Sequence, residues 1–232
     1  MGRVKPKALL SWSSGKDSAW ALHVLRQRGE VDVVGLVTTF NEAFDRVAMH
    51  AVRRTLVEAQ ARAAELPLWP VPLPWPCSNA EYEQRMRAVV HQAVLKGISR
   101  FAFGDLYLED VRRYREQQLA GTGLDPIFPV WTTPDATSYL AIQIIQEGMQ
   151  AVLTCVDPQK LAPEFVGREF DLQLLAELPA NIDACGEQGE FHTFCFAGPI
   201  FSRKIEFDVG EIIERDGFWF ADLLPELDRG NA

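Results

Sequence analysis

The chain has 232 residues, of which 47% are hydrophobic, enough for a globular protein with a substantial core. Acidic residues outnumber basic ones by 32 to 23, and the formal net charge of −9 disfavours nucleic acid and anionic membranes as partners. No stretch approaches the roughly 20 apolar residues that cross a bilayer, so we expect no membrane segment.

The four cysteines, at positions 77, 155, 185 and 195, form no C-x-x-C pair and lack the spacing of a zinc site. We therefore expect reduced, mostly buried thiols, with Cys185 and Cys195 acting as packing residues rather than nucleophiles. The apolar run near the N-terminus ends at the polar stretch SSGKDS, which is not typical of a signal peptide. These features favour a cytoplasmic protein.

The first part of the chain alternates strand-like and helix-like segments. Residues 7–12 form a short apolar run typical of a buried strand, and residues 17–28 show apolar positions at helical spacing, ended by Gly29. Residues 31–40 are a β-branched run typical of a strand covered on both faces. The remaining expected elements are a helix from Met49 with Val52, Leu56 and Ala59 inward, a proline-interrupted strand over 66–74, a helix capped by Ser78 and Glu81 with Tyr82, Met86, Val89 and Ala93 inward, a strand over 100–106, a helix over 108–121 and a strand over 125–131.

This alternation predicts an α/β fold with a doubly wound, mostly parallel sheet. After a helix over 136–149 and a strand over 150–157 the rhythm changes to strand-like segments at 191–201, 204–213 and 218–223. The last two flank Arg215-Asp216-Gly217, a good hairpin signal. We place a boundary in the Gly/Pro-rich stretch 121–126 and expect an N-terminal domain of residues 1–123 and a smaller α+β domain of residues 124–232.

Between the first strand and the first helix lies Ser13-Ser14-Gly15-Lys16-Asp17-Ser18. A loop at this place directs backbone N–H groups and the positive end of the helix dipole at one point, which suits a phosphate. Small residues let the backbone approach the anion, and Lys16 adds a full charge. The loop is not a Walker A motif, since Leu10 and Asp17 stand where glycine and serine or threonine are needed. The alternative is a serine-rich helix cap without a ligand.

The S-S-G-K-D-S loop resembles the PP-loop of ATP pyrophosphatases, which cleave ATP between its α and β phosphates. Four further segments are similar in order and spacing to the diphthine–ammonia ligase family and its prokaryotic relatives: TTFNEAFDRVAMHAVRR (38–54), FGDLYLEDVRRYRE (103–116), GREFD (167–171) and CGEQGEFHTFCFAGPIF (185–201). The loop alone indicates a superfamily, whereas the G-E-x-G-E-[FY]-H-T block is much more specific. The resemblance covers nearly the whole chain.

The resemblance implies an adenine nucleotide alpha hydrolase-like fold of the HUP type and a ligase that forms carbon–nitrogen bonds. Such an enzyme adenylates a carboxylate with ATP and Mg²⁺, then transfers ammonia and releases AMP and pyrophosphate. The family's acceptor is diphthine on elongation factor 2, while a bacterial source would point to a different carboxylate, such as a small metabolite. The sequence leaves open the acceptor, the nitrogen source and the oligomeric state, a homodimer included.

The expected site residues come from three parts of the chain. The ATP-binding residues are Ser11, Ser13, Ser14, Gly15, Lys16, Asp17, Ser18, Val37, Thr38, His50 and Gly104, with Asp17 as metal ligand. The catalytic residues are Lys16, Asp105, Glu187, Glu190 and His192. Two carboxylates with a histidine could position ammonium and accept its protons, work that needs a base with a pKa near neutrality.

Each assignment has a structural alternative. Asp17 and Asp105 could cap the helices that follow them, and His50, expected at the start of the second helix, could be a capping or surface residue. The 186–193 block could be a glycine turn with polar side chains in water, although Glu190 and His192 share a face at strand spacing. Two other functions stay open: a PP-loop RNA-modifying enzyme, which the acidic charge and missing C-x-x-C disfavour, and a protein that binds ATP without turnover.

Overall fold

The computed structural model describes residues 4–47 and 50–226 and contains two sheets. Sheet A holds β1 (Lys7–Ser11), β2 (Asp32–Asn41), β3 (Arg46–Val47), β4 (Leu68–Leu73), β5 (Arg100–Ala102) and β6 (Asp125–Ile127). Its long path runs β4-β2-β1-β5-β6 with every pair parallel, and β3 adds a short antiparallel pairing to β2. This is the doubly wound, mostly parallel sheet that the sequence predicts.

Sheet B contains β7 (Gln150–Val156), β8 (Phe191–Ala197), β9 (Phe207–Arg215) and β10 (Phe218–Pro225), in the order β8-β7-β10-β9 with all pairs antiparallel. Asp216 and Gly217 both have positive φ, 53° and 82°, and form the predicted two-residue hairpin turn between β9 and β10. With its flanking helices, sheet B forms the smaller C-terminal α+β part. The predicted boundary at residues 123 and 124 stays a prediction.

The helices are α1 (Lys16–Arg28), α2 (Arg54–Ala63), α3 (Asn79–Leu95), α4 (Glu109–Leu119), α5 (Thr137–Gln146) and α6 (Leu172–Glu177). As predicted, α1 ends at Gly29, which adopts the left-handed conformation, and Ser78 caps α3 by accepting from Glu81 N. The expected start of the second helix is wrong: α2 begins at Arg54, so Val52 and His50 lie in the preceding loop, and Met49 lies outside the described residues.

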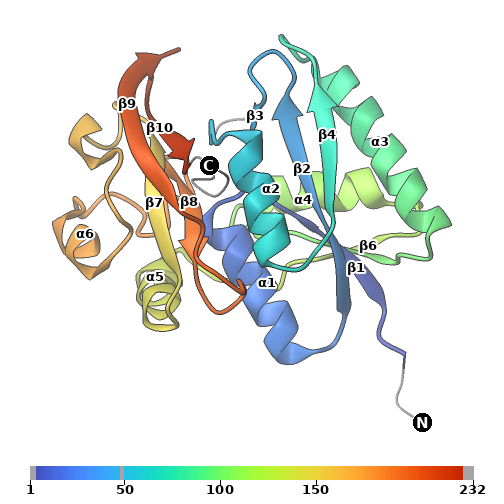
Figure 1. Cartoon of the computed structure of the whole chain (residues 1–232). Coiled ribbons are helices and arrows are strands. Elements are labelled where there is room, and N and C mark those ends of the chain that lie inside the picture. The colour runs from blue at the N-terminus through green and yellow to red at the C-terminus, as the bar shows by residue number, and fades with distance from the viewer. Residues whose placement is uncertain (1–3, 48–49, 227–232) are drawn as a thin grey trace, which may run out of the picture.

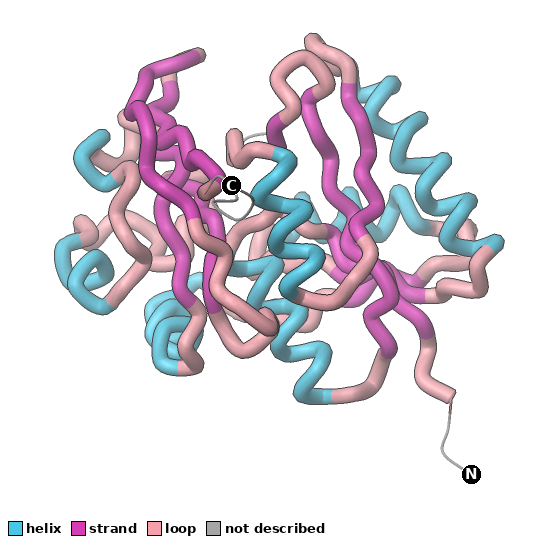
Figure 2. Tube along the Cα trace, in the orientation of Figure 1, coloured by secondary structure: helices cyan, strands magenta, loops and turns pink. Residues whose placement is uncertain are grey.

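Alternating side chains of β1 enter two different cores. Leu9 packs with residues of α3 and α4 such as Val90 and Leu119, whereas Leu10 packs with α1, α2 and sheet B. Helices α1 and α2 therefore lie between the two sheets, and α3 and α4 cover the other face of sheet A (Figures 1 and 2). The larger core includes Phe194 and Phe196 of β8 together with α1 and α2, so it belongs to both sheets.

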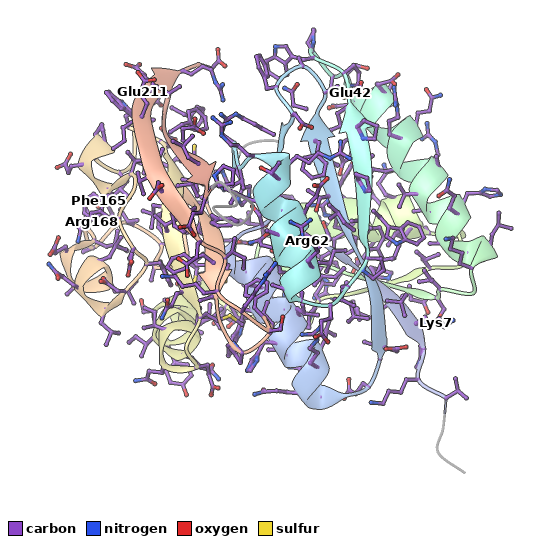
Figure 3. The ribbon with its side chains drawn as sticks, viewed as in Figure 1. Lys7, Glu42, Arg62, Phe165, Arg168 and Glu211 are labelled. Atoms are coloured by element: carbon purple, nitrogen blue, oxygen red, sulfur yellow. The ribbon has the colours of Figure 1, made fainter. Side chains whose placement is uncertain are left out.

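The parallel strands of sheet A all point the same way, which fixes the end at which a ligand would bind. Lys7 begins β1, and Glu42 follows β2 at the opposite end of the sheet (Figure 3). In open α/β sheets, ligands bind beyond the carboxyl ends of the strands, at the point where the strand order reverses. Here that point lies between β1 and β5, because the chain moves outward from β1 to β2 and β4 on one side and to β5 and β6 on the other.

Candidate active site

The loop after β1 turns sharply into α1 and is held by the C-terminal part of the chain. Ser14 has a φ of 72° and is fully buried. Its carbonyl accepts hydrogen bonds from Cys195 N in β8 (2.9 Å) and from Gln60 Nε2 in α2 (2.9 Å). The backbone N–H of Lys16 donates to Thr193 Oγ1 at 3.1 Å. Strand β8 of sheet B thus fixes the predicted phosphate loop of sheet A.

Gln60 is a buried link that the sequence did not reveal. Its side-chain oxygen accepts from Trp12 Nε1 at 2.8 Å, and its Nε2 donates to Ser14 O and, at 2.6 Å, to Cys195 O. Its side chain is 0% exposed, so these partners replace all contact with water. One amide therefore joins β1, the loop and β8.

Lys16 forms a buried ion pair with the residue next to it. Its Nζ donates to both carboxylate oxygens of Asp17, at 3.0 and 2.9 Å, and to the carbonyl of Cys185. Burial is the largest single influence on Lys16 and would lower its pKa, but the charge and hydrogen bonds of Asp17, together with the nearby Cys185 and Glu187, outweigh it and the pKa is raised. The ammonium therefore keeps its charge. Asp17 lies in the first turn of α1, whose N-cap is Gly15, so the capping alternative for Asp17 is wrong.

Gly104 and Asp105 follow β5 on the same edge of the sheet. A Cβ on Gly104 would lie 3.0 Å from the backbone of Asp17 and Ser18, so only glycine allows this close approach to the loop. Asp105 does not cap α4, whose N-cap is Leu108, and instead lies 3.5 Å from Arg115. Burial raises the pKa of Asp105.

Two histidines from distant parts of the chain lie next to each other beside the loop after β1. The rings of His50 and His192 are 4.6 Å apart, and His50 Nδ1 lies 3.1 Å from Thr193 O. Burial lowers the pKa of His50 to about 4, and burial with the neighbouring His50 and Lys16 lowers that of His192 to about 3. Both imidazoles are neutral at pH 7.

The two glutamates of the G-E-x-G-E block take different positions. Glu187 accepts from Leu106 N at 2.8 Å, and burial, together with the charge of Asp17, raises its pKa to about 8. Glu190 precedes β8, is 3% exposed and accepts from Asp183 N at 3.1 Å. The glutamates therefore do not form one pair of catalytic carboxylates.

These segments enclose a cavity of about 270 Å³, which we call the central cavity. It contains most of the predicted site residues: Ser11, Ser13, Lys16, Asp17, Ser18, His50, Gly104, Asp105, Glu187 and His192. Five predicted residues are not on its surface: Ser14, Gly15, Val37, Thr38 and Glu190. Val37 packs in the core, and Thr38 donates to Trp12 O at 2.7 Å, because β2 is buried on both faces.

The central cavity also has lining residues to which the sequence assigned no binding or catalytic role: Phe103, Arg115, Cys185, Gly186, Gly189, Phe191 and Thr193. Thr193 and Cys185 lie within or beside the G-E-x-G-E-F-H-T block, and that motif could have identified them. Arg115 lies on a charged helix where nothing in a single sequence separates it from its solvated neighbours. Burial raises the pKa of Cys195 to about 12 and also raises that of Cys185, which agrees with packing thiols.

No group of three or more metal-ligating side chains occurs within residues 4–47 and 50–226, and no helix in those ranges is long and apolar enough to cross a membrane. A doubly wound sheet with a glycine-containing loop lining a cavity at its switch point is the arrangement typical of α/β proteins that bind nucleotides.

The chain belongs to the diphthamide synthase family. The family model for the diphthamide synthase N-terminal domain matches residues 6–125, and that for the C-terminal domain matches residues 136–224. A diphthine–ammonia ligase of Bos taurus is 25% identical over 236 aligned residues, which cover 91% of this chain and 86% of the bovine protein. A diphthine–ammonia ligase of Danio rerio is 31% identical over 122 residues, covering 50% of this chain and 47% of the fish protein.

Proposed function

We propose that the protein is an ATP-dependent, amide-forming ligase that adenylates a carboxylate, transfers ammonia to it and releases AMP and pyrophosphate. One observation carries the proposal: the loop after β1 and the G-E-x-G-E-F-H-T block line the same cavity at the switch point of the sheet. Both curated relatives are named diphthine–ammonia ligase, which supports an acid and ammonia as the two joined substrates.

The first step forms a bond between an oxygen of the acceptor carboxylate and the α-phosphorus of ATP, and breaks the bond to the β-phosphate. Negative charge then develops on the departing pyrophosphate. Lys16 supplies a retained positive charge, and the first turn of α1 adds the positive end of its dipole. The wall formed by His50 and His192 is neutral, so it adds no charge that would hold the product anion.

The residues present fit a Mg²⁺ ion that arrives with ATP. Mg²⁺ prefers carboxylate oxygens and is held by one or two of them plus the substrate phosphates, so a three-residue protein cluster is not required. Asp17 and Asp105 both line the central cavity, and the buried Asp105 Oδ2 has no hydrogen-bond partner among the described residues. We assign these two side chains to the ion, which supplies charge neutralisation on the phosphates.

In the second step the ammonia nitrogen bonds to the acyl carbon, AMP departs, and the nitrogen loses a proton. The sequence suggested a histidine and two glutamates for this work. A pKa of about 3 makes His192 a poor base at neutral pH, and Glu190 is not on the cavity surface. Glu187, with a pKa of about 8, fits the requirement for a base that titrates near neutrality. We therefore propose that Glu187 accepts the proton from the ammonia nitrogen and that His192 positions the ammonia.

The acceptor is a carboxylic acid; the names of the relatives point to diphthine on a protein, and a small metabolite acid is the alternative. The test incubates the protein with Mg²⁺-ATP, ammonium and a panel of carboxylic acids, and separates the nucleotides by chromatography. We expect acid-dependent AMP and pyrophosphate in equal amounts. Formation of ADP would contradict the proposal. Lys204→Met, at an exposed lysine, is the control for Lys16→Met and should keep full activity.

A further inference from the structure

A second cavity lies between α3 and α4, on the face of sheet A turned away from sheet B. We call it the α3–α4 groove; its volume is about 310 Å³, within the usual range for small-molecule sites. Its walls are mainly apolar and aromatic: Tyr82, Met86, Val90, Phe101, Tyr114 and Leu119.

The groove adjoins the central cavity. Phe103 and Arg115 line both, so these two side chains form the boundary between the two spaces. The Arg115 guanidinium lies 5.0 Å from the centre of the Phe103 ring. Its Nε and the Asp105 Oδ2 that faces it are 3.5 Å apart, and neither atom makes a hydrogen bond within the described residues. This loose pair leaves donors on Arg115 for another carboxylate.

The charge of the groove differs from that of the whole chain, whose net charge is −9. None of the groove's lining residues, all of which fall within the described ranges, is acidic, whereas Arg115 and Arg87, the latter paired with Glu83 outside the groove, carry positive charge. An apolar space with a guanidinium at its inner end is complementary to an anion that carries an apolar body.

We propose that the α3–α4 groove binds the apolar body of the acceptor acid, so that the acceptor is an amphipathic carboxylic acid whose carboxylate pairs with Arg115 at the boundary with the central cavity. The identity of this acid as acceptor rests on the proposed ligase function, whereas its binding in the groove does not. Each methylene group buried in the groove should raise the affinity by about fourfold.

The experiment measures binding to the full chain without ATP, by calorimetry, for straight-chain acids from acetate to octanoate. We expect the affinity to rise with each methylene. Val90→Phe fills the groove from α3, so it should remove the dependence on chain length and lower the affinity for octanoate at least tenfold. Val94→Phe, one turn away and outside the groove, should leave the affinity unchanged. If Val90→Phe does not fold, Gln118→Trp at the groove's rim, with the exposed Gln117→Trp as its control, gives the same comparison.

Affinity that is independent of chain length, or unchanged in both groove variants, overturns the groove assignment. So does a wild-type dimer that Val90→Phe converts to a monomer in sedimentation, since the groove would then be covered by a second copy. The AMP assay separates the two proposals. If binding depends on the chain length of the acid but no acid-dependent AMP forms, only the ligase function is contradicted. If AMP forms at a rate independent of the chain length of the acid, only the groove assignment is contradicted.

Discussion

At the scale of single residues, the central cavity holds its charges in unusual states. A buried ammonium at Lys16 is neutralised by Asp17, two neighbouring imidazoles stay uncharged, and the carboxyl of Glu187 holds its proton up to about pH 8. Such shifts accompany function more often than they accompany simple packing. The sequence identified these residues because they sit in motifs, but their protonation depends on burial that only the fold determines.

Lys16→Met should lower the free energy of unfolding by about 3 kcal/mol, because it leaves the Asp17 carboxylate without its buried partner. Lys16→Met combined with Asp17→Asn should regain most of that stability, since no unpaired charge remains. Both variants should lose ATP turnover by at least about 100-fold. Urea unfolding and AMP formation measure the two effects. Turnover that recovers along with stability would show that Lys16 acts only in folding.

Replacing His192 should make the protein more tolerant of acid. The pKa of His192 is about 3 in the folded state, below its ordinary value near 6.5, so the stability it contributes is present above pH 6.5 and is lost as the pH falls toward 3. Between pH 7 and pH 5 wild type should lose about 2 kcal/mol more than His192→Gln.

The measurement for His192 is urea unfolding at several pH values. Glu187 acts in the opposite direction, since its pKa of about 8 stabilises the fold as the pH falls from 8 toward 4.5, so each variant is compared with wild type at the same pH. Gln92→Leu, at an exposed position of α3, serves as control and should follow wild type. A His192→Gln curve parallel to wild type would contradict the lowered pKa.

At the scale of elements, hydrophobic spacing was enough to predict most strands and helices, but not what each side chain faces. The β-branched run of β2 was correctly interpreted as covered on both faces. That burial turns the side chains of Val37 and Thr38 into the core, away from the cavity for which they were proposed. His50 was assigned to a helix that begins four residues later, because Met49 and Val52 continue the apolar spacing of Leu56 and Ala59 back into the loop before α2.

Gln60 shows where sequence reasoning ends at this scale. On α2 it is one more polar residue among apolar positions, and its three partners lie 46 to 135 residues away along the chain, with Trp12 at a separation of 48. Only the contact between α2, the loop after β1 and strand β8 gives it a role. No spacing rule within one helix could reveal this link.

Gln60→Leu should therefore damage both the fold and the site. It leaves Trp12 Nε1 without its buried partner and removes one hydrogen bond each from Ser14 O and Cys195 O, so it should lower the free energy of unfolding by about 3 kcal/mol. The freed loop should also bind ATP more weakly, measured by calorimetry under conditions where the variant is folded. Gln92→Leu, at an exposed site on α3, should change neither quantity. Unaltered ATP affinity in Gln60→Leu would show that the loop keeps its conformation without the Gln60 link.

At the scale of the whole molecule, the two sheets share one core and are also joined by charges at its edge. Asp222 of β10 accepts from Arg46 Nη1 at 2.8 Å and from Arg53 Nη2 at 2.6 Å. Burial opposes the charge of Asp222, but these hydrogen bonds hold its pKa to about 2. The change of rhythm after residue 157 correctly predicted a smaller C-terminal α+β part, whereas the sharing of one core could not be inferred from either half of the sequence.

We expect the protein to unfold in one cooperative transition. Tryptophans lie in both parts, at Trp12 and Trp219 for example, so fluorescence and far-UV circular dichroism should give coincident urea curves. A fragment of residues 1–135 would expose the apolar sides of α1 and α2 that pack against β8, and should bind a hydrophobic dye. Two separate transitions, or a fragment that folds without dye binding, would contradict the shared core.

The hydrogen bonds of the loop after β1 limit which sequence changes can be combined in one chain. Ser14 bonds to Gln60 and Cys195, and Lys16 bonds to Thr193. These bonds make the loop after β1 and strand β8 depend on each other, because a change on either side must suit the other. Chimeras that exchange the C-terminal half with a distant relative should therefore lose the contact between the loop and β8. The contact should be kept only when residue 60 and strand β8 come from the same parent. Recombination within the family is expected to preserve these positions together.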